Sequence, residues 1–299
     1  MRKLIVLALV GFAAQLVDGA LGMGYGVTSS SLLILVGLTP VAASAAVHFS
    51  ELGTNIASGV SHWKLQNVDW RVVARIAGPG AVGAFLGATV LSSLSTEAAR
   101  PIMSGILALL GVYILVRFIV GIRPRLSTKA LSLKFLAPLG VFAGFVDATG
   151  GGGWGPVATP ALIADGRLQP RKVIGTVDTS EFAVSAAASI GFLVGLGAAG
   201  INWAFALALL VGGVIAAPLA AYLVKVAPAH LLGVAVGGVI LLTNARTILR
   251  AYDVADPIRI VSYLAIVLVT LVGLYVAALR ARRRAASGAD ELVAEDTKV

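Results

Sequence analysis

The sequence lacks cysteine altogether and contains little charge. None of its 299 residues is a cysteine, which excludes disulfides, thiolate catalysis and cysteine-bound metals or clusters. Charged residues make up 12% of the chain, about half of the share found in soluble domains, whereas 58% of residues are hydrophobic. A chain with so little charge cannot cover a water-facing surface. We therefore predict an all-α polytopic membrane protein.

The charge that is present is mainly basic, with a formal net charge of +9. Lys and Arg lie in short segments between apolar stretches and in the tail at 280–284. This is the distribution of topology signals in membrane proteins. It leaves no basic face free of lipid-facing sequence, so we expect a lipid bilayer as the partner and no nucleic acid.

The chain contains an internal repeat. Residues 11–26 read GFAAQLVDGALGMGYG and residues 140–155 read GVFAGFVDATGGGGWG, so Val17-Asp18 corresponds to Val146-Asp147. Further on, Ser50-Glu51 corresponds to Ser180-Glu181, and the stretch from Gly80 resembles the stretch from Gly213. We predict two repeats, 1–120 and 133–250, joined by a basic cytoplasmic linker at 121–132.

Each repeat is expected to contain a broken helical hairpin and three full spans. The hairpins each consist of two apolar pieces of 11 to 17 residues, shorter than the ~20 residues of a full crossing, on either side of a glycine stretch. We predict hairpins at 4–36 and 133–164, spans at 40–60, 71–94, 100–120, 172–198, 203–224 and 229–249, a final span at 258–279, and a polar, disordered cytoplasmic tail within 280–299.

The loop charges predict that the two repeats are inverted. If each hairpin returns to its side of entry, a repeat crosses the membrane three times, and the second repeat has the opposite orientation. With the Arg-rich C-terminus in the cytoplasm, the basic loops 61–70, 121–132 and 165–171 lie inside, whereas 37–39, 95–99, 199–202 and 250–257 lie outside and are nearly neutral. The N-terminus is then outside, with Arg2 and Lys3 as the exceptions.

The two glycine stretches predict a binding site. Broken backbone within a membrane is tolerated only where protein or a water-filled cavity satisfies its polar groups, so two breaks predict a central cavity. The half-helices that follow would point free N–H groups and positive dipole ends at an anion. Alternatively, the glycines only allow helices to cross closely. The substrate contacts that we expect are Gly24, Tyr25, Thr28, Ser29, Ser30, Gly152, Gly153, Trp154 and Thr159.

Two of these groups of residues have an alternative interpretation. The Ser and Thr hydroxyls could bond back to their own helix backbone, as they often do in buried helices. Tyr25 and Trp154, at corresponding positions, either line the cavity as O–H and N–H donors or pack over the glycines.

Ionisable residues within the predicted spans are candidates for proton coupling. His48 and Glu51 lie three residues apart on one helix face, and so do Asp178 and Glu181. Intramembrane ionisable residues usually mark a functional interior, and a carboxyl group there could carry a proton with the substrate. A structural role, with a neutral Glu bonded to the broken backbone, is the alternative. Asp18 and Asp147 could cap the glycine breaks instead.

Metal and enzyme functions are disfavoured by the sequence. The His48-x-x-Glu51 pair has no second histidine nearby, and no nucleophile motif accompanies the Ser, His and Asp residues. The glycine stretches lack the preceding strand of a nucleotide-binding loop. We therefore expect no metal, no cofactor and no catalytic residues.

These residues resemble the TauE/SafE family of sulfite and sulfonate exporters. The resemblance covers about 4 to 280 and is carried by the segment 144–156, GFVDATGGGGWGP, by Gly175-Thr176 and Ser180-Glu181, and by the degenerate first copy at 11–31. It implies transport of sulfite or small organosulfur anions across the prokaryotic cytoplasmic membrane. It also implies a site at Gly150–Pro156, Thr176 and Glu181, with Glu51 as the repeat partner.

The sequence therefore predicts a secondary transporter for a small sulfur-containing anion such as sulfite, sulfoacetate or another short organosulfonate, working by alternating access. The exact anion, the direction, the coupling ion and a homo-oligomeric state are left open. The alternatives are an anion channel for the same substrates, a carrier of small carboxylates, and, from another class, an intramembrane enzyme or an assembly scaffold.

Overall fold

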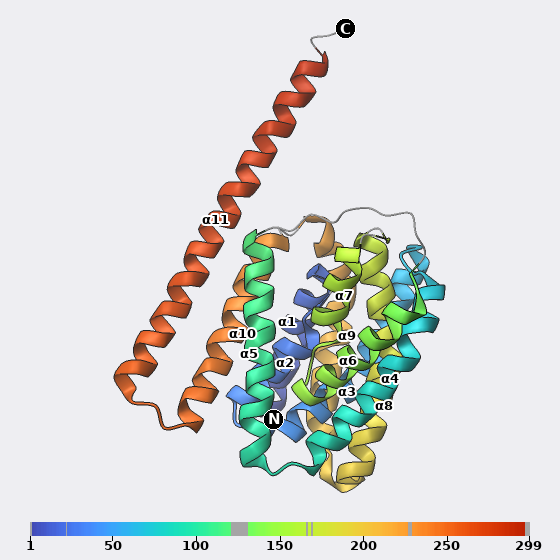
Figure 1. Cartoon of the computed structure of the whole chain (residues 1–299), viewed down its shortest axis with the longest axis vertical. Coiled ribbons are helices and arrows are strands. Elements are labelled where there is room, and N and C mark those ends of the chain that lie inside the picture. The colour runs from blue at the N-terminus through green and yellow to red at the C-terminus, as the bar shows by residue number, and fades with distance from the viewer. Residues whose placement is uncertain are drawn as a thin grey trace.

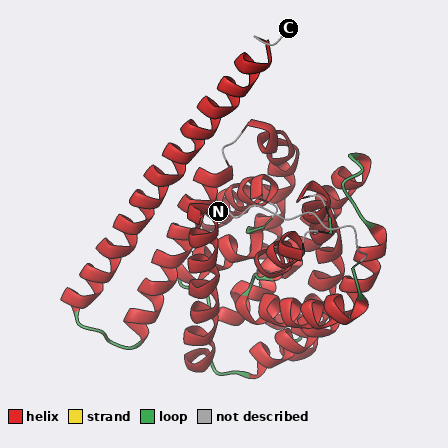
Figure 2. Ribbon diagram, turned by 45° about the horizontal axis from the view of Figure 1, so that its top comes forward, coloured by secondary structure: helices red, strands yellow, loops and turns green. Residues whose placement is uncertain are grey.

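The computed structural model describes residues 2–21, 23–120, 131–165, 167–168, 170–226 and 229–296. Every regular element in this part of the chain is a helix (Figure 2). Gly22 and most of the predicted linker, 121–130, lie outside the described residues. The helices are α1 (Arg2–Leu21), α2 (Tyr25–Leu35), α3 (Pro40–Lys64), α4 (Trp70–Ser93), α5 (Thr96–Val120), α6 (Leu133–Gly150), α7 (Trp154–Asp165), α8 (Pro170–Leu196), α9 (Trp203–Val226), α10 (Ala229–Ala251) and α11 (Asp256–Asp296), with a short 3₁₀ turn at Ala198–Gly200.

Six of the described helices are long and apolar enough to cross a membrane. They are Trp70–Ser93, Thr96–Val120, Leu133–Gly150, Lys172–Leu196, Gly233–Ala251 and Asp256–Arg280. The chain is thus a multi-pass membrane protein. The large apolar side chains exposed on the outer surface of the bundle, for example Leu109 and Leu264, suit lipid contact.

The helix bounds recur at corresponding positions of the two repeats. The first break lies between Leu21 and Tyr25, and the second lies between Gly150 and Trp154. Trp70 begins α4 and Trp203 begins α9. These two helices contain the stretches 80–91 and 213–224, which correspond to each other in sequence. The helices are therefore interrupted at both glycine stretches, as predicted, although the opposite orientation of the repeats stays a prediction.

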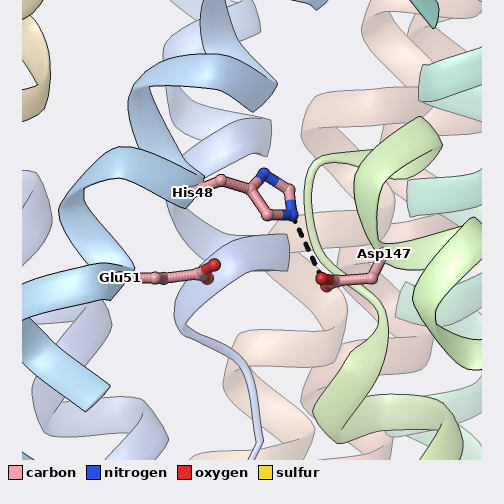
Figure 3. A group of neighbouring side chains, drawn as sticks. All are labelled: His48, Glu51 and Asp147. Carbon is pink, nitrogen blue, oxygen red and sulfur yellow. Dashed lines mark hydrogen bonds and ion pairs between the residues drawn. The ribbon is translucent and has the colours of Figure 1, made fainter. Parts of the chain in front are cut away.

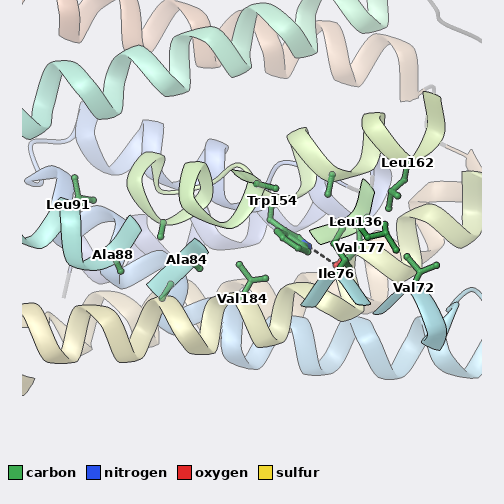
Figure 4. Packing of buried hydrophobic residues seen from close by; sticks show 14 of the residues in the cluster. Val72, Ile76, Ala84, Ala88, Leu91, Leu136, Trp154, Leu162, Val177 and Val184 are labelled. Carbon is green, nitrogen blue, oxygen red and sulfur yellow. Dashed lines mark hydrogen bonds between the residues drawn. The ribbon is translucent and has the colours of Figure 1, made fainter. Parts of the chain in front are cut away.

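Each repeat contributes helices to a buried cluster formed mainly by the other: α4 in one direction, and α9 with α10 in the other. One buried cluster joins α4 of the first repeat to α6, α7 and α8 of the second, through side chains such as Ile76, Leu136, Trp154 and Val184 (Figure 4). The other joins α9 and α10 of the second repeat to α1, α2, α3 and α5 of the first. Neither repeat encloses a core of its own.

Helix α3 lies in the middle of the bundle and packs against both α8 and α9. Its buried side chains include many polar ones, which is why it is not among the helices apolar enough to be recognised as a span. These are Ser44, His48, Ser50, Glu51, Thr54 and Asn55.

Helix α11 lies at the edge, beside α10, and projects beyond the bundle (Figure 1). It continues to Asp296, so our expectation of a disordered tail is wrong for these residues. The tail is rich in Ala, Arg and Glu, which favour helix even without packing.

Candidate functional site

The two helix breaks meet inside the bundle. A Cβ atom on Gly26, at the start of α2, would lie 2.6 Å from the Cα atom of Gly152, and one on Gly152 would lie 2.2 Å from the N atom of Val27. Only glycine allows so close a contact. The Ser30 hydroxyl donates a hydrogen bond to the Gly151 carbonyl and joins the two breaks. We had expected a cavity between the breaks, but at this point they touch directly.

Each half-helix is capped by an aspartate seven residues before it. The Asp18 carboxylate accepts a hydrogen bond from the Tyr25 N–H at 3.2 Å. The Asp147 carboxylate accepts from the N–H groups of Gly153 at 2.7 Å and Trp154 at 3.0 Å. Carboxylates are favoured at helix starts, where N–H groups are free and the dipole is positive. Some of the amides that we predicted for an anion are therefore already bonded to the chain's own carboxylates.

A buried ionisable cluster lies beside the breaks. His48 and Glu51 project from α3 towards Asp147 on α6, as Figure 3 shows. The His48 Nε2 atom lies 3.1 Å from Asp147 Oδ2, and both side chains are almost completely buried. Glu51 Oε2 accepts a hydrogen bond from the Ser185 hydroxyl at 2.9 Å, whereas its Oε1 has no partner in the described part of the chain.

The hydrogen bonds around His48 require a proton between His48 and Asp147. Nδ1 lies 2.8 Å from the Ser44 carbonyl, which only accepts, so Nδ1 carries a hydrogen. The Ser44 hydroxyl donates to the Ala148 carbonyl at 2.7 Å and leaves that assignment unchanged. Nε2 of a neutral ring would then have no hydrogen, and an ionised carboxylate has none either. The 3.1 Å contact therefore places one proton on either His48 or Asp147.

The same cluster has a spacing that suits a metal ion. His48 Nε2 and one oxygen each of Glu51 and Asp147 lie within 4.8 Å of one another. However, the contact between Nε2 and Oδ2 is a hydrogen-bond distance, which a proton explains. Our expectation that no metal is needed stays a prediction.

The two matched aromatic residues use their polar atoms within the protein. The Tyr25 hydroxyl lies 3.0 Å from the Ser50 hydroxyl and 3.4 Å from the Leu209 carbonyl. The Trp154 indole N–H donates to the Val177 carbonyl at 3.0 Å. Both rings are buried. This agrees with the packing alternative, in which the aromatics support the breaks rather than contact a substrate.

Two hydroxyls on α2 remain candidates for substrate contacts. Thr28 Oγ1 and Ser29 Oγ are buried and have no hydrogen-bond partner among the described residues. They lie in the first turns of α2, close in sequence to the contact between Gly26 and Gly152. Thr159 is fully buried on α7, the corresponding half-helix. Buried hydroxyls without a partner, such as those of Thr28 and Ser29, are costly unless a ligand or water satisfies them.

Several predicted site residues lie elsewhere. Thr176 accepts a hydrogen bond at 2.9 Å from the Asp69 N–H in the connection between α3 and α4, which differs from the substrate contact that we predicted. Asp178 faces His62 near the end of α3, at 3.7 Å between Oδ2 and Nε2. Glu181 is half-buried on α8. The structure therefore brings His48 and Glu51 together with the breaks, whereas Thr176 bonds the connection between α3 and α4 and Asp178 faces His62.

From the sequence, Asp147 is expected only to cap the second glycine break. The structure gives it a second role, as the partner of His48. The repeated Val-Asp pair was the signal that marked it, although nothing in the sequence showed that His48 would face it. Ser185, which bonds Glu51, had no signal at all.

A comparison with protein families decides the identity. The model described as "Sulfite exporter TauE/SafE" matches residues 7–247, from α1 to α10. The chain belongs to the TauE/SafE family.

This TauE/SafE protein also has relatives named as transporters. It is 52% identical over 268 residues, 89% of each chain, to the probable membrane transporter protein YtnM of Bacillus subtilis (strain 168). It is 25% identical over 191 residues to the probable membrane transporter protein YdhB of the same organism, covering 63% of this chain and 78% of that one. No solved structure matches it. The family and these names indicate a membrane transporter rather than an enzyme.

Proposed function

We propose that the protein is a secondary transporter that moves a small sulfur-containing anion across the prokaryotic cytoplasmic membrane by alternating access. Sulfite, sulfoacetate and similar short organosulfonates are the substrate class. One observation carries the proposal: two capped half-helices meet at Gly26 and Gly152, beside the buried pair of His48 and Asp147. Broken helices meeting in the interior, at a repeat interface, are typical of secondary transporters.

The anion is proposed to bind where α2 and α7 begin. Thr28 and Ser29 supply hydroxyl groups that have no partner within the described chain. The N–H groups of Gly153 and Trp154 supply further donors once Asp147 releases them. Neutral donors of this kind hold an anion without a fixed positive charge, which favours release.

The proton shared by His48 and Asp147 is proposed to couple to the anion. An ionised Asp147 occupies the start of α7 and repels a second negative charge. When the proton resides on Asp147 Oδ2, that charge is removed, and Oδ1 of the neutral carboxyl group holds the Gly153 and Trp154 amides less strongly, so that an anion can compete for them. Return of the proton to His48 restores the carboxylate, which displaces the anion. Glu51 has an oxygen within 4.8 Å of both groups, and one bridging water would let it accept the proton next.

The remaining parts of the mechanism are also proposals. The recurrence of helix bounds and the exchange of α4 and α9 support two repeats that rock against each other. Opposite orientation of the repeats, an external N-terminus and a cytoplasmic C-terminus follow from the loop charges. Asp178 and Glu181 stay candidates for a secondary role in proton movement.

Flux into proteoliposomes containing the purified protein tests the proposal. We expect saturable uptake of labelled sulfite, acceleration by unlabelled sulfite or sulfoacetate on the opposite side, and a change of rate with a pH gradient. A channel would follow the gradient without counterflow. If small carboxylates drive counterflow and sulfur anions do not, the sulfur assignment fails. A complete lack of flux would contradict transport by this protein alone.

A further inference from the structure

A second polar cavity lies at the far end of α2 from the breaks. Its volume is about 250 Å³, which is room for a small anion with several waters, since one water occupies about 30 Å³ in the liquid. The end of α2, the start of α5 and the last turns of α10 enclose it. Three arginines line it, together with Thr247 and parts of the backbone around Gly37: Arg100, Arg246 and Arg250.

The three arginines are not paired with carboxylates, although the exposed Glu97 lies one turn before Arg100 on α5. None of them forms an ion pair with a carboxylate within the described residues. The Nε atom of Arg100 is buried and lacks a hydrogen-bond partner among them. A buried donor on a charged group without a partner is costly, so a cluster of this kind is expected to have an anionic occupant.

Helix dipoles do not explain the cluster. Arg246 and Arg250 lie near the end of α10, where a positive charge is favourable. Arg100, however, lies in the first turns of α5, where the dipole disfavours a cation. In the predicted orientation this end of the bundle faces outside, where Lys and Arg are also disfavoured as topology signals. Arg100 therefore opposes both preferences, whereas Arg246 and Arg250 oppose the second.

A row of polar residues leads from this cavity to the helix breaks. On α10, Asn244 donates a hydrogen bond at 2.8 Å to the Ser31 hydroxyl on α2. Ser30, the residue before Ser31 on α2, donates a hydrogen bond to the Gly151 carbonyl at the breaks. On α5, the buried Ser104 hydroxyl, one turn from Arg100, has no partner among the described residues. Helix α2 thus connects the arginines to the candidate site.

The corresponding cavity in the other repeat has a different character. It has a volume of about 480 Å³ and lies between α5 and α7. Ile163 and Ala164 line it in place of Ile34 and Leu35, and Tyr113 and Arg117 stand where α10 has Arg246 and Arg250. Its single arginine is bonded to the Tyr113 hydroxyl at 3.2 Å. Of these two cavities, the one at the end of α2 combines several arginines.

We infer that the cavity lined by Arg100, Arg246 and Arg250 is an oxyanion-binding site at the outer mouth of the protein. It takes a tetrahedral or pyramidal oxyanion, which is either a free sulfur anion or phosphate, or the phosphate of a lipid headgroup. Its role as the outer mouth of a transport path rests on the proposed function. The binding of an oxyanion does not.

Titration of the purified, delipidated full-length protein with sulfite, sulfate and phosphate tests the binding. Calorimetry at low salt should give a Kd that rises about tenfold or more in Arg100→Gln and in Arg246→Gln, because each removes a charge-assisted hydrogen bond. Arg246→Lys should lose less, and added NaCl should weaken binding. Arg259→Gln is the matched control, since Arg259 is paired with Asp256 near the start of α11. Glutamine variants that bind like this control would overturn the inference.

Reconstitution separates the two sources of the oxyanion and the two proposals. In liposomes of phosphatidylcholine alone, the arginine variants should raise the KM for external sulfite at unchanged maximal flux. If the variants differ from wild type only when phosphatidylglycerol is added, the occupant is a lipid phosphate. Flux with an unchanged KM and unchanged Kd refutes the site but keeps the transporter. Arginine-dependent binding without any flux keeps the site but refutes transport.

Discussion

The indole ring of Trp154 packs directly over Gly80, and the ring of Tyr25 packs in the same way over Gly213. A Cβ atom on Gly80 would lie 2.6 Å from the indole ring, and one on Gly213 would lie 3.3 Å from the phenol ring. Trp154 corresponds to Tyr25 in the repeat, and Gly80 corresponds to Gly213. Each half-helix is thus positioned at its first residue by a glycine of the helix that the other repeat contributes.

Substitution of Gly80 should destabilise the protein. In Gly80→Ala, the new methyl group overlaps the buried Trp154 ring, and overpacking of this kind costs about 1–3 kcal/mol. Thermal unfolding in detergent should show a lower Tm. Gly78→Ala on the same helix is the control, because nothing lies within 4 Å of its Cβ position. Equal melting of the two variants would contradict the packing described for Trp154.

Substitution of Gly152 should abolish transport. Its φ of 147° is unfavourable for any other residue, and a Cβ atom there would lie 2.2 Å from the Val27 N atom. In Gly152→Ala we expect the two half-helices to separate. Sulfite flux should then fall about tenfold or more, which corresponds to a transport barrier that is higher by about 1.4 kcal/mol or more. Gly105→Ala, whose Cβ position is open, should transport normally. Normal flux in Gly152→Ala would show that the contact is not required.

Replacement of Asp147 should remove the pH dependence of flux. Asp147→Asn keeps an acceptor oxygen for Gly153 and Trp154 but can neither share a proton with His48 nor carry a charge. We expect sulfite to bind, and counterflow to continue, without a response to a pH gradient. Asp18→Asn is the matched control: Asp18 caps α2 in the same way, and no histidine contact involves it among the described residues. A pH response that survives in Asp147→Asn would refute coupling through this pair.

Glu51 and Ser185 separate a proton-carrying role from a structural one. Glu51→Gln retains the hydrogen bond with Ser185 but cannot ionise, so proton-driven flux should fall while counterflow persists. Ser185→Ala removes the bond and leaves the carboxyl group, so it should cost about 1 kcal/mol of stability and keep the pH response. If Ser185→Ala loses the response as Glu51→Gln does, the glutamate is structural. EDTA should not change the flux of Glu51→Gln or of Ser185→Ala, since a proton and not a metal is proposed to occupy the buried ionisable cluster.

Much of the fold was accessible from the sequence because apolar length and glycine placement act locally. The breaks before Tyr25 and Trp154 were predicted because each glycine stretch divides its segment into two short apolar pieces. The exchange of α4 and α9 between the repeats was not predicted, since it depends on which apolar surfaces fit together. The helical end of α11 was not predicted, because the polar composition of the tail was given more weight than its helix propensity.

The site was predicted less completely, for a physical reason. The sequence shows which groups are ionisable and buried, but not which way they face across the bundle. His48 was paired in sequence with Glu51, yet its contact is with Asp147, which is 99 residues away. The family resemblance implied that Thr176 is a site residue, but its hydroxyl accepts a hydrogen bond from a backbone N–H in the connection between α3 and α4. Side-chain direction across helices of distant sequence is set by tertiary packing.

The polar interior of α3 has a consequence for how the protein is made. A helix carrying buried Ser44, His48 and Glu51 is a poor candidate for stable residence in lipid by itself, because these groups find their partners on α6 and α8. Those helices emerge from the ribosome only after the first repeat is complete. Biogenesis must therefore keep α3 sheltered until the second repeat arrives, and a truncated first repeat should be a substrate for quality-control proteolysis.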